Sequence, residues 1–133
     1  MTLLIYTAKN ENAGERLLKI IDTVISEVDV KIYRTIDALS KGLREPRADV
    51  IVVILIACSK QDLMDLLSIR DLLSDMKLIL ILPDRDQDTI VKGHILRPRF
   101  MSHCNSDFVD VAAVLDLMIR HLSSDKRNTD IYT

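Results

Sequence analysis

Several side chains that could take part in chemistry stand where short apolar segments of the chain end. They are Thr7, Asn10, Cys58, Asp84, Asp86, His103 and Cys104. Thiolates and imidazoles bind transition metals, whereas carboxylates and amide oxygens bind harder cations. If the apolar segments are parallel strands, these side chains share one edge of a sheet, and open α/β sheets bind ligands at that edge. The positions of these side chains relative to one another therefore indicate which kind of site they could form.

Cys58 and Cys104, together with His103, are candidates for a metal site or a disulfide. The two cysteines end the third and fifth apolar segments, so a fourth strand is expected between them. Two strand spacings amount to roughly 9 to 10 Å, and we expect that a disulfide would require backbone movement. Half-buried thiols that behave as small hydrophobic side chains are the preferred interpretation, and a metal site is the alternative.

The acidic residues Asp84, Asp86 and Asp88 have the spacing that opens a calcium-binding loop. Such a loop needs glycine at its sixth position and glutamate at its twelfth, but this chain has Thr89 and Ile95 there. We therefore expect these carboxylates to cap a helix. The chain also has no glycine-rich nucleotide-binding phrase. The sequence predicts no catalytic residue, no metal and no cofactor, and hence no enzyme.

The composition indicates one globular domain that binds neither nucleic acid nor membrane. The chain has 133 residues, of which 48% are hydrophobic and 29% charged, and its net charge is −2. It has no Trp and no cluster of Lys and Arg, so it lacks the stacking platforms and the cationic surface of nucleic-acid binders. The longest apolar run, residues 50–58, has nine residues, whereas a membrane-spanning helix needs about 20. No signal-peptide pattern is present, and we expect a cytoplasmic protein with reduced cysteines.

Five short apolar segments alternate with segments of helical periodicity, which is the pattern of a parallel sheet with crossover helices. The third and fourth segments are apolar without interruption, as burial on both faces requires, so we place them in the middle of the sheet. The second segment alternates and suits an edge. The predicted strands span residues 3–8, 30–34, 50–57, 78–82 and 100–104.

The helical segments repeat apolar residues at spacings of three and four. They span residues 17–28, 36–43, 63–73, 88–92 and 107–122. The fourth is predicted to stop at Gly93, a residue suited to a left-handed helix end. The sequence after Leu122 is polar and lacks periodicity. We therefore predict one domain, residues 1–124, followed by a polar C-terminal tail, residues 125–133.

The order and length of these elements resemble the receiver domain of bacterial response regulators, of the chemotaxis type. The phrase Ala48-Asp49-Val50-Ile51-Val52-Val53 resembles the start of a receiver's third strand. The resemblance covers nearly the whole chain and makes residues 1–124 a receiver-like domain. It implies an α/β fold, a flavodoxin-like three-layer sandwich whose five-stranded parallel sheet has the order 2-1-3-4-5 and carries five helices.

Receivers are phosphorylated at the carboxyl edge of this sheet by a small set of groups. An acidic pair after strand one and an aspartate ending strand three hold Mg²⁺, and that aspartate accepts the phosphoryl group. A hydroxyl after strand four and a lysine ending strand five contact the phosphoryl oxygens. The resemblance aligns these positions, in that order, with Thr7 and Ala8, Ile54 or Leu55, Leu82 or Pro83, and His103. None carries the receiver's group, so the chain is expected to be a degenerate receiver without the phospho-acceptor aspartate.

The predicted function is a phosphorylation-independent signalling module of two-component type that acts through protein–protein contact. The partner is another protein, or a second copy in a homodimer formed through helix four, strand five and helix five, a face that receivers use for contacts. The candidate interaction face is His94, Ile95, Arg97, Arg99 and Phe100, because it mixes apolar, arginine and aromatic side chains. The alternative is a small-molecule or metal-binding protein, or an enzyme, that uses the carboxyl edge of the sheet.

Overall fold

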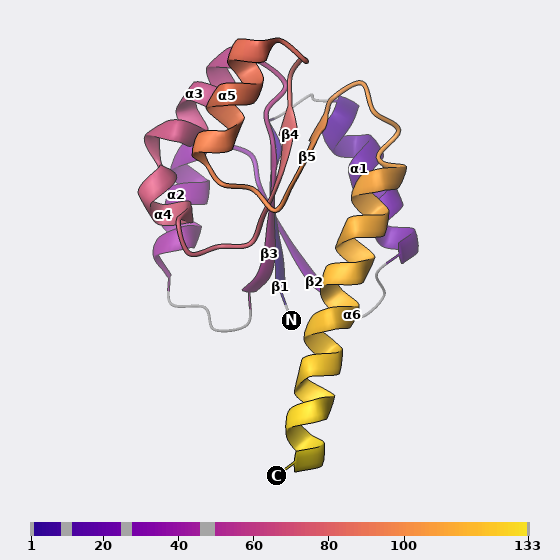
Figure 1. Ribbon diagram of the computed structural model, residues 1–133. Helices are drawn as coiled ribbons and strands as arrows, with labels where there is room; N and C mark the ends of the chain where they lie inside the picture. Colours follow the sequence, from indigo (N-terminus) through magenta and orange to yellow (C-terminus); the bar gives the residue numbers. More distant parts are fainter. Residues whose placement is uncertain (1, 9–11, 25–27, 46–49, 133) are drawn as a thin grey trace.

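The computed structural model describes residues 2–8, 12–24, 28–45 and 50–132. Within these residues, five strands and six helices alternate along the chain (Figure 1). The strands are β1 (Thr2–Tyr6), β2 (Asp29–Tyr33), β3 (Val50–Ile56), β4 (Leu78–Leu82) and β5 (Phe100–His103). The helices are α1 (Asn12–Val24), α2 (Ile36–Arg44), α3 (Lys60–Ser68), α4 (Arg70–Leu73), α5 (Gln87–Ile95) and α6 (Val109–Tyr132).

The strands form one parallel sheet in the order β2-β1-β3-β4-β5. Helices α1 and α6 cover one face, and α2, α3, α4 and α5 cover the other (Figure 1). This arrangement confirms the predicted three-layer α/β fold and its strand order. Among the described residues no helix is long and apolar enough to cross a membrane.

The apolar runs of β3 and β4 occupy the centre of the sheet, as predicted. Helices pack on both of its faces, so neither face of a central strand meets water, and every residue of β4 is buried. Strand β2 lies at one edge and has an exposed or half-buried residue at every position. Uninterrupted hydrophobicity is therefore the signal that separates the central strands from the edge in this chain.

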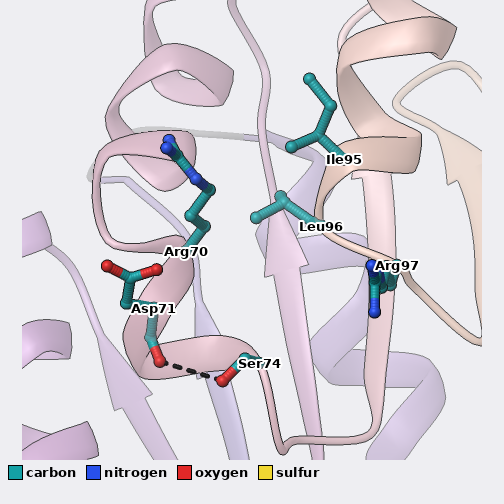
Figure 2. Close-up of a pocket in the computed structure, with 6 residues that line it drawn as sticks. All are labelled: Arg70, Asp71, Ser74, Ile95, Leu96 and Arg97. Atoms are coloured by element: carbon teal, nitrogen blue, oxygen red, sulfur yellow. Dashed lines mark hydrogen bonds between the residues drawn. The ribbon is translucent and has the colours of Figure 1, made fainter.

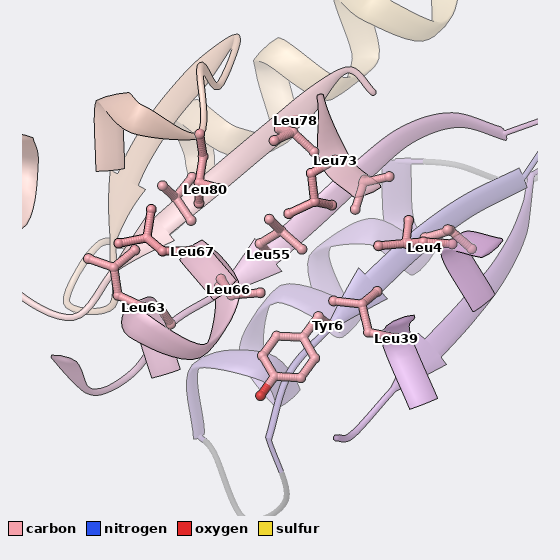
Figure 3. Close-up of a cluster of buried hydrophobic side chains, with 14 of the residues drawn as sticks. Leu4, Tyr6, Leu39, Leu55, Leu63, Leu66, Leu67, Leu73, Leu78 and Leu80 are labelled. Atoms are coloured by element: carbon pink, nitrogen blue, oxygen red, sulfur yellow. The ribbon is translucent and has the colours of Figure 1, made fainter. Parts of the chain in front are cut away.

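The two faces of the sheet are filled by side chains of different shape. On the face covered by α2 to α5, the core consists mainly of leucines, among them Leu55, Leu78 and Leu80 (Figure 3). On the face covered by α1 and α6, the same strands contribute mainly Ile and Val, such as Ile54 and Ile79. Successive residues of a strand point to opposite faces, so the alternation of Leu and Ile along β4 separates the two types.

The third predicted helix is two helices in the structure. Helix α3 ends at Ser68, Ile69 adopts a non-helical conformation (φ −110°, ψ 20°), and the short α4 follows. Both helices still bury leucines on the same face of the sheet. The apolar residues keep the same periodicity on both sides of Ile69, so the sequence pattern does not show that the helix is interrupted there.

The predicted helix end at Gly93 is wrong. Helix α5 continues to Ile95, and Gly93 is buried inside it. A Cβ at this position would lie 3.0 Å from a Leu82 methyl and 3.1 Å from Met101 Sδ, so the glycine serves close packing of α5 on the sheet. The left-handed residue after α5 is Arg97, with φ 53°.

Helix α6 runs to Tyr132, so its predicted end at residue 122 is too early. Its second half extends beyond the sheet (Figure 1). The division into a domain, residues 1–124, and a tail, residues 125–133, stays a prediction.

Candidate functional site

The candidate site is the carboxyl edge of the sheet, where the predicted chemical side chains were expected to meet. Leu82 pairs with His103 at the end of β4 and β5. Beyond them, the Cys104 amide donates to the Leu82 carbonyl at 2.9 Å, and the Ala57 amide donates to the Ile81 carbonyl at 2.9 Å. Leu82 and His103 therefore end β4 and β5 at this edge, and Ala57 directly follows the end of β3.

Ile54 does not lie at this edge. It pairs with Ile79 of β4, and Ile79 pairs with Phe100 at the start of β5. The next residue, Leu55, pairs with Leu80. The alignment of the phospho-acceptor position with Ile54 or Leu55 is therefore corrected: both residues lie inside β3, and Ala57, directly after the strand, lies beside the end of β4.

Thr7 and Ala8 directly follow β1. Thr7 is fully buried, and its amide donates to the Tyr33 carbonyl at 3.0 Å. A Cβ on Gly14 of α1 would lie 2.2 Å from Thr7 Oγ1, so the threonine side chain is enclosed by the helix. Ala8 is half-buried. The first strand thus presents no carboxylate here, and Asn10, the other predicted side chain, lies outside the described residues.

His103 ends β5 and contacts an arginine. Arg85 Nε donates to His103 Nε2 at 2.9 Å. The contact joins the segment after β4 to the end of β5.

Polar and acidic side chains near this edge accept hydrogen bonds from backbone amides, and one carboxylate pairs with a lysine, but the side chain of Asp86 does not cap α5 as predicted. Ser59 Oγ accepts from the Asp62 amide at 3.1 Å, and Asp62 Oδ2 accepts from the Cys58 amide at 3.2 Å, which satisfies amides at the start of α3. Lys60 Nζ lies 3.2 Å from Asp86 Oδ2 at the start of α5. Across the part of the chain that the structure describes, no three His, Cys, Asp or Glu side chains gather as metal ligands would.

Asp84 is stabilised in its ionised form by its surroundings. The Thr89 hydroxyl, the Asp86 amide and the charge of Lys60 lower the pKa of Asp84 below 3.8. Its contribution to stability is therefore present above the unfolded-state pKa and is lost as the pH falls through the folded-state pKa. The hydrogen bond and charge of Asp86 raise the pKa of Lys60 above 10.5, so that contribution is present at lower pH and is lost as the pH rises through the folded-state value.

The two cysteines meet at the carboxyl edge, so their predicted separation is wrong. Cys58 Sγ and Cys104 Sγ are 3.1 Å apart. Both side chains pack against the core on the α1 and α6 face, whereas Leu82, which ends β4 between them, belongs to the opposite core. No Leu82 side chain therefore separates the sulfur atoms, and the segments after β3 and β5 converge past the end of β4.

Arg16 of α1 fixes the segment that contains Cys104. Its guanidinium donates to the Ser106 carbonyl at 2.8 Å and also to the Cys104 carbonyl. The same group lies over the Phe108 ring, 4.8 Å from its centroid. Sequence patterns gave no indication of Arg16, because its partners lie about ninety positions away along the chain.

The predicted interaction face is only partly assembled by the structure. His94, Ile95, Arg97 and Arg99 are exposed, but Phe100 is half-buried and packs against the core on the α1 and α6 face. Phe100 therefore offers less of its side chain to solvent than the other four residues of the predicted face.

Ile95 and Arg97 help to line a pocket of about 350 Å³ between α4 and the end of α5 (Figure 2). Its lining residues are Arg70, Asp71, Ser74, Ile95, Leu96 and Arg97. Ser74 Oγ donates to the Asp71 carbonyl at 3.1 Å, which holds the α4 side of the pocket. We call this surface the α4–α5 pocket.

The strand order and the helices on both faces of the sheet are those of the receiver fold. A response regulator receiver protein from Pseudoalteromonas atlantica is similar in structure, with a TM-score of 0.67, 12% sequence identity, and coverage of 95% of this chain and 99% of that one. A protein from Burkholderia pseudomallei described as pilus assembly-related has a TM-score of 0.55, 13% identity, and coverage of 86% and 90%. No protein-family model and no curated sequence matches the chain.

Proposed function

We propose that this chain is a signalling module of the two-component type, a degenerate receiver that works without phosphorylation through contact with another protein. The chemistry of the carboxyl edge carries the proposal. Thr7, Ala57, Leu82 and His103 stand at this edge, and none of them can accept a phosphoryl group as an aspartate does or hold Mg²⁺ as a carboxylate does.

The proposed contact surface is the α4–α5 pocket with the neighbouring face of α5. Val91 and Ile95 are 56% and 51% exposed and stand one helical turn apart, so they place two large apolar side chains side by side in solvent. Arg70 and Arg97 line the pocket against one carboxylate, that of Asp71. These charges favour a protein partner that offers an apolar side chain flanked by acidic residues.

The same proposal covers the remaining expectations about this chain. It places the module in the cytoplasm, where two-component receivers act, with no cofactor and no catalytic activity of its own. With a net charge of −2 and its cations dispersed along the sequence, the chain is not suited to bind the phosphate backbone of nucleic acid.

Incubation with acetyl phosphate and Mg²⁺ tests the absence of phosphorylation. The intact mass of the protein is expected to stay unchanged, whereas a receiver with its aspartate would gain the mass of a phosphoryl group. The same sample, treated with beryllofluoride and Mg²⁺, is expected to show an unchanged NMR spectrum. A Mg²⁺-dependent adduct in either experiment would refute the proposal.

Affinity capture with matched variants tests the contact surface. A specific partner should bind the parent protein and Ile32→Asp, but should lose at least tenfold in affinity for Ile95→Asp and for Arg97→Glu. Ile32 is the matched control because it is 41% exposed on β2, at the other edge of the sheet. Equal binding by all variants would exclude this surface as the contact site. If the parent protein is a dimer in solution and Ile95→Asp is a monomer, the partner is a second copy of the chain.

A further inference from the structure

Cys58 and Cys104 form a dithiol pair at the carboxyl edge, and we propose that this pair is a reversible redox site that closes to an intramolecular disulfide. The proposal starts from the 3.1 Å distance between the sulfur atoms. A disulfide bond is about 2.0 Å long, so the sulfurs need to approach by about 1 Å. A change of this size lies within the range of small side-chain rotations at each cysteine.

The backbone on both sides of the pair is held in place by hydrogen bonds. The Cys58 amide donates to Asp62 Oδ2 at 3.2 Å, at the start of α3. The Cys104 amide donates to the Leu82 carbonyl at 2.9 Å, and the Cys104 carbonyl accepts from Arg16. Both cysteines are thus fixed next to each other before any bond forms, which raises the effective concentration of one thiol for the other.

Both cysteines are partly exposed, so a small oxidant can reach them. The co-reactant is a low-molecular-weight disulfide such as oxidised glutathione. One cysteine thiolate attacks it, forms a mixed disulfide and releases one reduced thiol. The second cysteine thiolate then attacks the protein sulfur of the mixed disulfide and releases a second reduced thiol. The protein loses two electrons and two protons, and the oxidant gains them.

The bond would tie the segment between β3 and α3 to the segment between β5 and α6, across the end of β4. Receivers, which share this fold, accept their phosphoryl group at the same edge. An effect of the disulfide on partner contact rests on the proposed function, whereas formation of the disulfide does not. The two are therefore measured separately.

Equilibration of the full chain with mixtures of reduced and oxidised glutathione tests the redox site. At high oxidised glutathione, the parent protein is expected to lose the mass of two hydrogens and to become inert to thiol alkylation. Tryptic peptides of the same sample should contain Cys58 joined to Cys104, a result that depends on no variant. The thermal midpoint should rise by roughly 10 °C, and dithiothreitol should reverse all of these changes.

Cys58→Ser and Cys104→Ser are the matched controls, since each is expected to accept one glutathione and to show no such rise in thermal midpoint. The proposal is overturned if the parent protein keeps two alkylatable thiols at every glutathione ratio. It is equally overturned if the parent protein carries two glutathione adducts or only intermolecular disulfides. If the disulfide forms but partner affinity does not change, the redox site is supported. Only the proposed effect of the disulfide on the contact surface is then contradicted.

Discussion

Replacing Ile54 with aspartate is expected to lower the free energy of unfolding by roughly 3 to 5 kcal/mol, the cost of an uncompensated buried charge. Ile54 is fully buried and lies between Ile5 of β1 and Ile79 of β4. The buried residues that cluster with Ile54 are hydrophobic, so the carboxylate must be desolvated or protonated. The loss is a large part of the 5 to 15 kcal/mol that typically stabilises a domain.

Urea unfolding followed by circular dichroism measures this effect. Ile32→Asp makes the same chemical change at a residue that is 41% exposed, and it should alter stability by about 0.5 kcal/mol or less. Equal urea midpoints for Ile54→Asp and the parent protein would contradict the burial of Ile54. The result also tests whether residue 54 lies inside β3, as in the structure, or at the carboxyl edge, as the resemblance to receivers predicts. An aspartate at an open carboxyl edge would be tolerated.

Replacing Phe108 with alanine is expected to cost about 3 to 5 kcal/mol, as for other large aromatic residues in a core. Phe108 is fully buried, packs with α1 and α6 residues, and supports the Arg16 guanidinium. It also has φ 64°, a left-handed conformation that alanine tolerates no better. The substitution therefore removes the packing without relieving the backbone.

Phe100→Ala is the control for this prediction, because Phe100 packs against the same core but is only half-buried. It should cost clearly less than Phe108→Ala in the same urea experiment. Phe108→Leu should recover part of the loss, since leucine refills much of the volume. A larger loss of stability for Phe100→Ala than for Phe108→Ala would contradict the prediction that Phe108 contributes more to the core than Phe100.

The centre of the fold could be predicted from the sequence because its signal is local. The run from Leu78 to Leu82 is apolar at every position and is bounded by polar residues, and the structure gives β4 these same limits. Burial on both faces leaves no other assignment for such a run. The order of the strands came from the resemblance to receivers, which depends on the whole series of elements.

The details of the carboxyl edge could not be predicted, because they depend on where the chain goes after each strand ends. The resemblance aligns the phospho-acceptor position with Ile54, yet the predicted strand, residues 50–57, already continues past it, as β3 does through Leu55 and Ile56. Strand spacing set the expected distance between the cysteines, but this spacing says nothing about side chains that converge past the end of β4. The contact of Arg85 with His103 likewise depends on the path of a loop.

The division of the core into a leucine side and an isoleucine side also constrains how the sheet assembles. Leu and Ile are almost equally hydrophobic, so burial alone would tolerate a central strand that slipped by one residue. In β4, such a slip would send the isoleucines, which branch at Cβ, into space shaped for leucines, which branch at Cγ, and the reverse. The shapes of the side chains therefore disfavour a misaligned register of β4 that the hydrophobic effect alone would permit.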